Sequence, residues 1–113
     1  MSNFVFDDGN VGVIFATMQL YAVSAADMTP YLMFTRINQA DNEVNWSFYL
    51  GVTVLNVAFE TTSLPWLLQR RSKVFCAQPL KGTTGNGGVF LVKFETSTGL
   101  NIIANPAISG VII

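Results

Sequence analysis

The chain has no histidine and only one cysteine among its 113 residues. The absence of histidine removes the commonest general base, the usual partner of a nucleophilic serine or cysteine, and the commonest metal ligand. The single cysteine, Cys76, excludes an intrachain disulfide and a cysteine-based zinc cluster. Catalysis would have to depend on carboxylates, lysine or tyrosine. We therefore predict that the protein is not an enzyme and binds no cofactor or metal.

The few carboxylates fit turns better than a catalytic site. Glu60 and Glu95 are the candidate acid and base of an alternative, carboxylate-dependent enzyme, which requires that the two groups meet in one cleft. Residues 7–10 lack the ligand spacing of a calcium loop. Residues 81–88 begin with lysine and precede a predicted strand, unlike a phosphate-binding loop, in which the lysine closes the loop at a helix start. We interpret both segments as turn chemistry.

Charge is also scarce. Charged residues make up 12% of the chain, about half the usual share of about 25%, and the net charge is −1. The basic residues are scattered except for Arg70, Arg71 and Lys73, so nucleic acid is not expected as the main partner. A neutral surface does not repel a second copy and does not protect strand edges. This composition predicts a surface that is covered in use; the alternative is a monomer with an ordinary asparagine- and threonine-rich surface.

Long apolar runs and a secretory signal are missing as well. The two longest apolar stretches, residues 11–23 and 44–59, are shorter than the about 20 residues of a membrane helix, and polar residues interrupt both. The first ten residues have no basic segment and carry Asp7 and Asp8 where a signal peptide needs apolar residues. We expect no membrane span and a chain made in the cytoplasm without a signal peptide.

The clearest positive pattern runs from residue 44 to residue 60. Every second side chain from Val44 to Val54 is apolar, which is typical of a half-buried strand. After Val54 the phase inverts, which indicates a bulge or bend between residues 51 and 56. A straight segment would be about 55 Å long, more than the roughly 35 Å width of such a domain. It must bend or pass from one sheet to another.

The remaining pattern predicts a single domain over residues 1–113. Residues 31–38 should pair with the central strand as an antiparallel hairpin. Residues 11–23 also fit a helical face, but the β-branched start favours a strand. One short helix is predicted near residues 63–72, where Ser63 can cap it and Pro65 fits the first turn. The predicted fold class is all-β, a small antiparallel sandwich or barrel of about seven or eight strands. Further strands are expected at residues 3–6, 74–77 and 89–95, the last with Phe90, Val92 and Phe94 on its inner face. Residues 78–88 are expected to form a long loop or hairpin tip, and residues 100–104 and 107–113 a final pair of short strands.

The candidate functional residues are those expected to contact partners. They comprise the polar face of the central strand, the basic end of the predicted helix, the tip of the glycine-rich loop and the apolar C-terminal run. That run should either pair inside its own sheet or dock on a neighbouring subunit. The predicted interface residues are Tyr49, Thr53, Arg70, Arg71, Lys73, Gly85, Asn86, Ile108, Val111, Ile112 and Ile113.

Besides the carboxylate-dependent enzyme, these observations lead to two hypotheses about function. The leading one is a non-enzymatic structural subunit that self-assembles or docks on other structural subunits, for example a small virion protein of a phage. A capsid decoration, tail or minor capsid protein would fit, and its place of use would be the virion. The alternative is a β-barrel binding module for a small apolar ligand or peptide, with aromatic side chains lining its interior.

Overall fold

The computed structural model describes residues 4–6, 8–22, 28–52, 57–82, 88–105 and 108–112. The described residues form β-strands and their connections, without any helix, and so contain no helix that could span a membrane. The prediction of an all-β, antiparallel chain is confirmed, and three very short strands raise the number above the seven or eight expected. The strands are β1 (Phe4–Val5), β2 (Val11–Ala22), β3 (Met28–Asn38), β4 (Val44–Val52), β5 (Val57–Phe59), β6 (Trp66–Arg70), β7 (Lys73–Gly82), β8 (Val89–Glu95), β9 (Ile103–Asn105) and β10 (Ile108–Ile112).

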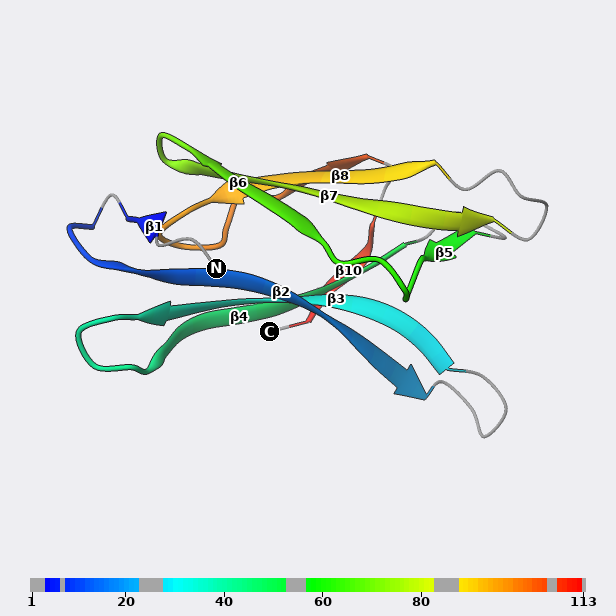
Figure 1. The fold of residues 1–113 in the computed structure, drawn as a ribbon, viewed down its shortest axis with the longest axis horizontal. Coiled ribbons are helices and arrows are strands. Elements are labelled where there is room, and N and C mark those ends of the chain that lie inside the picture. Colours follow the sequence, from blue (N-terminus) through cyan, green and yellow to red (C-terminus); the bar gives the residue numbers. More distant parts are fainter. Residues whose placement is uncertain are drawn as a thin grey trace.

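The strands form two antiparallel sheets that face each other (Figure 1). The first sheet has the order β1-β2-β3-β4-β10, and β3 pairs with β4 as the predicted hairpin. The second sheet has the order β5-β7-β8-β9. The additional strand β6 lies beside β5 on the same edge of β7, where it pairs with residues 73–77 while β5 pairs with residues 80–82.

The central segment does pass from one sheet to the other. Its first part, β4, lies inside the first sheet, and its second part, β5, lies at the edge of the second. In β4 the predicted alternation is confirmed, because Phe48 and Leu50 are buried while Ser47 and Tyr49 point to the opposite face and are partly exposed. The predicted bend falls mainly on residues 53–56, which lie outside the described residues.

An aromatic cluster fills the space between the sheets. Phe94 of the second sheet meets Phe34, Trp46 and Phe48 of the first, with ring centroids 5.1 to 5.6 Å apart and edge-to-face geometry. Aromatic pairs in this arrangement contribute about 0.5–1.5 kcal/mol beyond the area that they bury. The space around Phe94 is therefore filled by side chains.

The prediction of a helix near residues 63–72 is wrong. Residues 66–70 are the strand β6, and Leu67 packs against the core while Trp66 and Leu68 point outward and are exposed. The apolar residues of this segment fit both the 3.6-residue period of a helix and the two-residue period of a strand. An isolated helix shorter than about 12 residues is marginal in water. Pairing with the edge of β7 favours the strand over the helix, because it provides backbone hydrogen-bond partners along the length of β6.

Two other segments differ from the prediction. The strand expected at residues 74–77 continues as β7 to Gly82, so residues 78–82 are not part of a loop. Pro79 is tolerated in β7 because it lies where the neighbour on that edge changes from β6 to β5, and its carbonyl accepts the Glu60 backbone N–H at 3.0 Å. The two C-terminal strands do not pair with each other, since β9 pairs with β8 and β10 with β4.

Candidate interaction surface

The outer face of the second sheet carries an exposed apolar surface built by four adjacent strands. We call it the apolar face, and it consists of six large side chains together with Ala77. The exposed fractions are 61% for Trp66, 45% for Leu68, 37% for Phe75, 53% for Val89, 52% for Leu91 and 61% for Ile103.

The strand register brings these side chains together in rows across the sheet. Trp66 lies opposite Ala77, and Ala77 lies opposite Leu91. In the next row Leu68 lies opposite Phe75. Directly opposed residues in antiparallel strands have Cβ atoms about 4.5–5.5 Å apart, so their side chains touch on one face. Residues far apart in the sequence therefore form one continuous surface.

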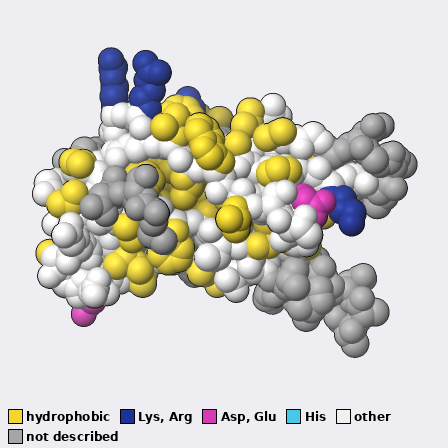
Figure 2. Space-filling model, viewed as in Figure 1, with side chains coloured by type: hydrophobic (Ala, Val, Ile, Leu, Met, Phe, Trp, Pro, Cys, Tyr) yellow, Lys and Arg dark blue, Asp and Glu magenta, His cyan; other side chains and the backbone are white. Residues whose placement is uncertain are grey.

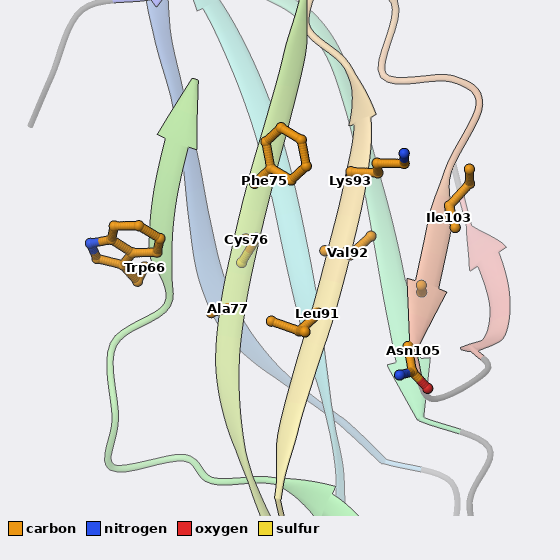
Figure 3. Close-up of a pocket in the computed structure, with 10 residues that line it drawn as sticks. Trp66, Phe75, Cys76, Ala77, Leu91, Val92, Lys93, Ile103 and Asn105 are labelled. Atoms are coloured by element: carbon orange, nitrogen blue, oxygen red, sulfur yellow. The ribbon is translucent and has the colours of Figure 1, made fainter. Parts of the chain in front are cut away.

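The apolar face is hollowed at its centre. Figure 3 shows Trp66 and Phe75 on one side of this depression and Leu91 and Ile103 on the other. Its volume is about 320 Å³. Lys93 is the charged residue among those that line it. The depression can accept apolar side chains, but it offers few groups for orienting a polar ligand.

Two of the strands that carry this surface have large apolar side chains on both of their faces. In β8, Phe90, Val92 and Phe94 are buried in the core, while Val89 and Leu91 face outward together with Lys93 and Glu95. Such two-sided apolar strands are typical of sheets that are covered on both faces. If each large side chain exposes roughly 100 Å², the six together expose on the order of 600 Å², at the upper end of the largest patches on ordinary monomers.

Basic residues border one end of the apolar face. Arg70 and Arg71 are exposed in the tight turn from β6 to β7, where Arg71 has a φ of 55° in the left-handed region. Lys73 pairs with Glu95 on the neighbouring strand, with 2.5 Å between Nζ and Oε1. Neither Arg70 nor Arg71 forms an ion pair within the described part of the chain. Their charges are therefore available to a partner.

The predicted interface residue Tyr49 lies on the other side of the molecule, on the outer face of the first sheet. Tyr49 is opposite Met33, and Met33 is opposite Thr17. Phe15, Thr35 and Ser47 form the next row. We call this surface the neutral face, because none of its described side chains is charged; it consists of Val13, Phe15, Thr17, Tyr31, Met33, Thr35, Ile37, Ser47 and Tyr49.

The remaining predicted interface residues lie in β10 or outside the described residues. Ile108, Val111 and Ile112 belong to β10, which pairs with β4 through the partners Val52, Leu50 and Tyr49. The expectation that the C-terminal run pairs inside its own sheet is therefore confirmed. The other members of the predicted set, which lie outside the described residues, are Thr53, Gly85, Asn86 and Ile113.

A buried arginine organises the end of the molecule that carries Arg70. The guanidinium of Arg36 contacts both carboxylate oxygens of Asp8 at 2.9 and 3.2 Å, and it donates to the Ser97 carbonyl at 2.6 Å. It also donates to Oδ1 of Asn38 at 2.9 Å and lies 3.7 Å from the ring centroid of Phe6. These contacts hold the β1–β2 and β8–β9 turns against β3.

The structure does not bring the candidate catalytic carboxylates together. Glu60 adjoins Pro79 near one end of β7, whereas Glu95 pairs with Lys73 at the other. Six strand positions, or about 20 Å, separate these two partners along β7. Hydrogen bonds from Thr62 lower the pKa of Glu60, so its environment does not favour a general acid.

Cys76 and the other potential metal ligands form no site in the described residues. Burial raises the pKa of the Cys76 thiol to about 12, so it is an unreactive thiol at neutral pH. The described residues contain no cluster of three or more acidic or cysteine side chains that could hold a metal ion.

The residues of the apolar face were not among those predicted from the sequence. Trp66 and Leu68 were missed because a helix was predicted for this segment. In a helix, Leu68 would belong to an apolar stripe of leucines that faces the core. The sequence of β7 and β8 does indicate this surface, because Phe75 and Leu91 occupy positions at which the alternation predicts polar residues. Apolar residues on both faces of a strand indicate that both faces are covered.

Comparison of the chain with protein families, with curated proteins and with solved structures finds no match. The surfaces themselves are thus the guide to function. They are an apolar face on one sheet, a neutral face on the other, and charged turns at one end.

Proposed function

We propose that this chain is a non-enzymatic structural subunit that assembles with copies of itself or docks on other structural subunits, and that its two facing sheets form a β-sandwich. The observation that carries this proposal is the apolar face, on which Trp66 and Ile103 are each 61% exposed. An interface that buried on the order of 600 Å² on each of two partners would reach the about 1,200 Å² of the smaller specific interfaces.

Within this class, a small virion protein of a phage fits best, as a capsid decoration, tail or minor capsid subunit. Such a subunit needs surfaces that match its neighbours and needs no catalytic group. The low charge, 12% of the residues, supports close packing of many copies. This assignment is an analogy of composition and architecture.

A binding module is the second candidate, and the 320 Å³ depression in the apolar face favours it. Ligand sites have volumes of about 300–1,000 Å³. A second cavity, of about 440 Å³, lies between the first sheet and the residues before β6, and Phe4, Phe15 and Leu67 help to line it. A ligand therefore has two candidate sites, this cavity and the depression between Trp66 and Leu91. Saturable quenching of Trp66 fluorescence by an apolar peptide in a monomeric protein would favour this alternative.

The native mass, measured by light scattering at several concentrations, tests the leading proposal. We expect the wild-type protein to assemble as the concentration rises, and Leu68→Asp to lower the mass because it places a charge in the apolar face. Leu100→Asp is the matched control, because Leu100 is 56% exposed but lies in the β8–β9 connection outside that face. Circular dichroism should show both variants folded. A wild-type protein that stays monomeric at high concentration contradicts self-assembly.

A further inference from the structure

We infer that copies of this chain stack head to tail, with the apolar face of one copy against the neutral face of the next. The inference rests on the proposed self-assembly and names the two surfaces that meet. The two faces lie on opposite sides of the molecule, because they are the outer faces of the two facing sheets (Figure 1). A copy placed above another in the same orientation brings them together.

The charged turns support this arrangement. The β6–β7 turn at the border of the apolar face carries Arg70 and Arg71, and the β3–β4 turn at the border of the neutral face carries Asp41 and Glu43. All four residues are exposed, and none of them forms an ion pair among the described residues. Among the described residues, each copy therefore presents the unpaired charges of Arg70, Arg71 and Lys93 on one side and two unpaired negative charges on the other.

Both turns lie at the same end of the molecule. The Ser72 carbonyl of the β6–β7 turn accepts the Thr96 backbone N–H at 2.7 Å. The adjacent Ser97 carbonyl accepts hydrogen bonds from Arg36 and from Nε1 of Trp46, which border the β3–β4 hairpin end. Figure 2 shows basic side chains at the corner where β6 turns into β7 and an acidic side chain at the corner below it. Parallel stacking therefore places the basic turn of one copy beside the acidic turn of the next.

The two faces are also similar in size. The apolar face lies on four neighbouring strands and the neutral face on three, and the longest strands, β7 and β2, have 10 and 12 residues. At about 4.8 Å between strands and 3.3 Å per residue, they cover roughly 600 and 500 Å² in projection. Two such faces together approach the about 1,200 Å² of a small specific interface. Tyr49, Phe15 and Met33 supply the aromatic and methionine side chains that are enriched at interfaces.

A two-fold dimer through the apolar face alone fits less well. With equal ends together, the Arg70 and Arg71 side chains of the two copies would repel each other. With opposite ends together, they would face the end of β7 that lies beside Glu60, whose charge Lys81 of the same copy already offsets. In the head-to-tail arrangement the charges of both turns are compensated. Such a contact between different surfaces does not close on itself, so it continues as a ring or a filament.

Charge reversal tests the arrangement. We expect R70E/R71E and D41R/E43R each to raise the concentration at half-assembly about tenfold at low ionic strength, because each replaces attraction by repulsion. The quadruple variant should return to within about twofold of the wild type. An equal mixture of the two double variants should also assemble, because both kinds of contact in it are complementary. Sedimentation velocity measures each case, and Lys81→Glu, at the opposite end of β7, is the matched control.

The outcomes separate this inference from the proposed function. A two-fold dimer through the apolar face leaves the β3–β4 turn outside the contact, so it predicts that D41R/E43R does not change assembly, and that result overturns head-to-tail stacking. If Leu68→Asp dissociates the assembly but neither charge reversal affects it, self-assembly stands and the stacking is wrong. If the wild-type protein never assembles, both are wrong.

Discussion

Arg36 is fully buried, and its contacts show how a single charged side chain is accommodated in an apolar domain. Its guanidinium is satisfied by the Asp8 carboxylate, the Ser97 carbonyl and the Asn38 side chain, and it covers the ring of Phe6. A buried charge with such partners does not pay the full desolvation penalty, but removal of one partner leaves it poorly compensated. The Arg36 cluster therefore holds the turns at this end in one arrangement.

The ion pair between Arg36 and Asp8 should make stability depend on pH. Partial desolvation raises the pKa of Asp8, but the hydrogen bonds from Asn10 and Arg36 and the charge of Arg36 outweigh it and leave the pKa below the ordinary 3.8. A carboxyl whose pKa is lower in the folded protein contributes stability above its unfolded pKa and loses it as the pH falls through the folded one. We expect this contribution to be complete above about pH 5 and to decrease progressively as the pH falls below about 4 and through the lowered pKa.

Asp8→Asn is the variant that isolates this effect. The urea midpoint of the wild-type protein should exceed that of Asp8→Asn by a constant amount from neutral pH to about pH 5, and the difference should shrink below about pH 4. Circular dichroism during urea titration measures both proteins. Glu60, whose pKa is also lowered, is present in both and cancels in the difference. A difference that is constant down to pH 3 would show that the pair contributes no pH dependence.

At the scale of single elements, β6 is where two sequence periods compete. A helix would bury Leu67 and Leu68 on one stripe, whereas the strand packs Leu67 on the core and leaves Leu68 45% exposed. The side-chain amide of Gln69 adds a second anchor, because it donates to the Val5 carbonyl and accepts the Val5 N–H. This amide joins β6 of the second sheet to β1 of the first.

Alanine variants of the two leucines distinguish the strand from the helix. We expect Leu67→Ala to lower the free energy of unfolding by about 2 kcal/mol, because it removes core contacts. Leu68→Ala should change it by less than about 0.5 kcal/mol. Urea unfolding at a concentration below that of any assembly measures both. Equal losses for the two variants would favour the helix.

Much of the element pattern could be predicted from the sequence, because it depends on local alternation. The hairpin of β3 and β4, the inward positions Phe90, Val92 and Phe94, and the transfer of the central segment between sheets followed from period and length. Local alternation could not show that the helix predicted near residues 63–72 and the loop predicted over residues 78–82 would both be replaced by strands. In both places, the pairing with a strand distant in the sequence decides the conformation.

At the scale of the whole molecule, the first sheet needs strands from both ends of the chain. It combines β1 to β4 with the C-terminal strand β10, whereas the second sheet is built from the continuous segment β5 to β9. The aromatic contacts of Phe94 with Phe34 and Phe48 cross between the two sheets. Because the first sheet is completed only by β10 and both sheets share this core, the domain should fold as one unit.

This topology predicts cooperative and rather slow folding. Circular dichroism and the fluorescence of Trp46, which lies in the aromatic cluster, should report the same urea midpoint, because both sheets are lost together. Refolding should take milliseconds to seconds, as in other domains in which strands distant in the sequence pair. Leu68→Asp serves as a monomeric control. Two separate transitions in that variant would show that the sheets unfold independently.

The sequence by itself determined that the fold is all-β, and it showed that the chain has no histidine and few charged residues. Alternation, low charge and the absence of histidine are properties of composition and local order, and they need no tertiary contact to be read. Only the tertiary structure decided that Trp66, Leu68, Phe75, Leu91 and Ile103 form one outer face. The same holds for the charged turns, which lie on opposite sides of one end because the Arg36 cluster ties the turns of the two sheets together. The physical reason is that a surface is built by the register of strands, and register is set by long-range pairing.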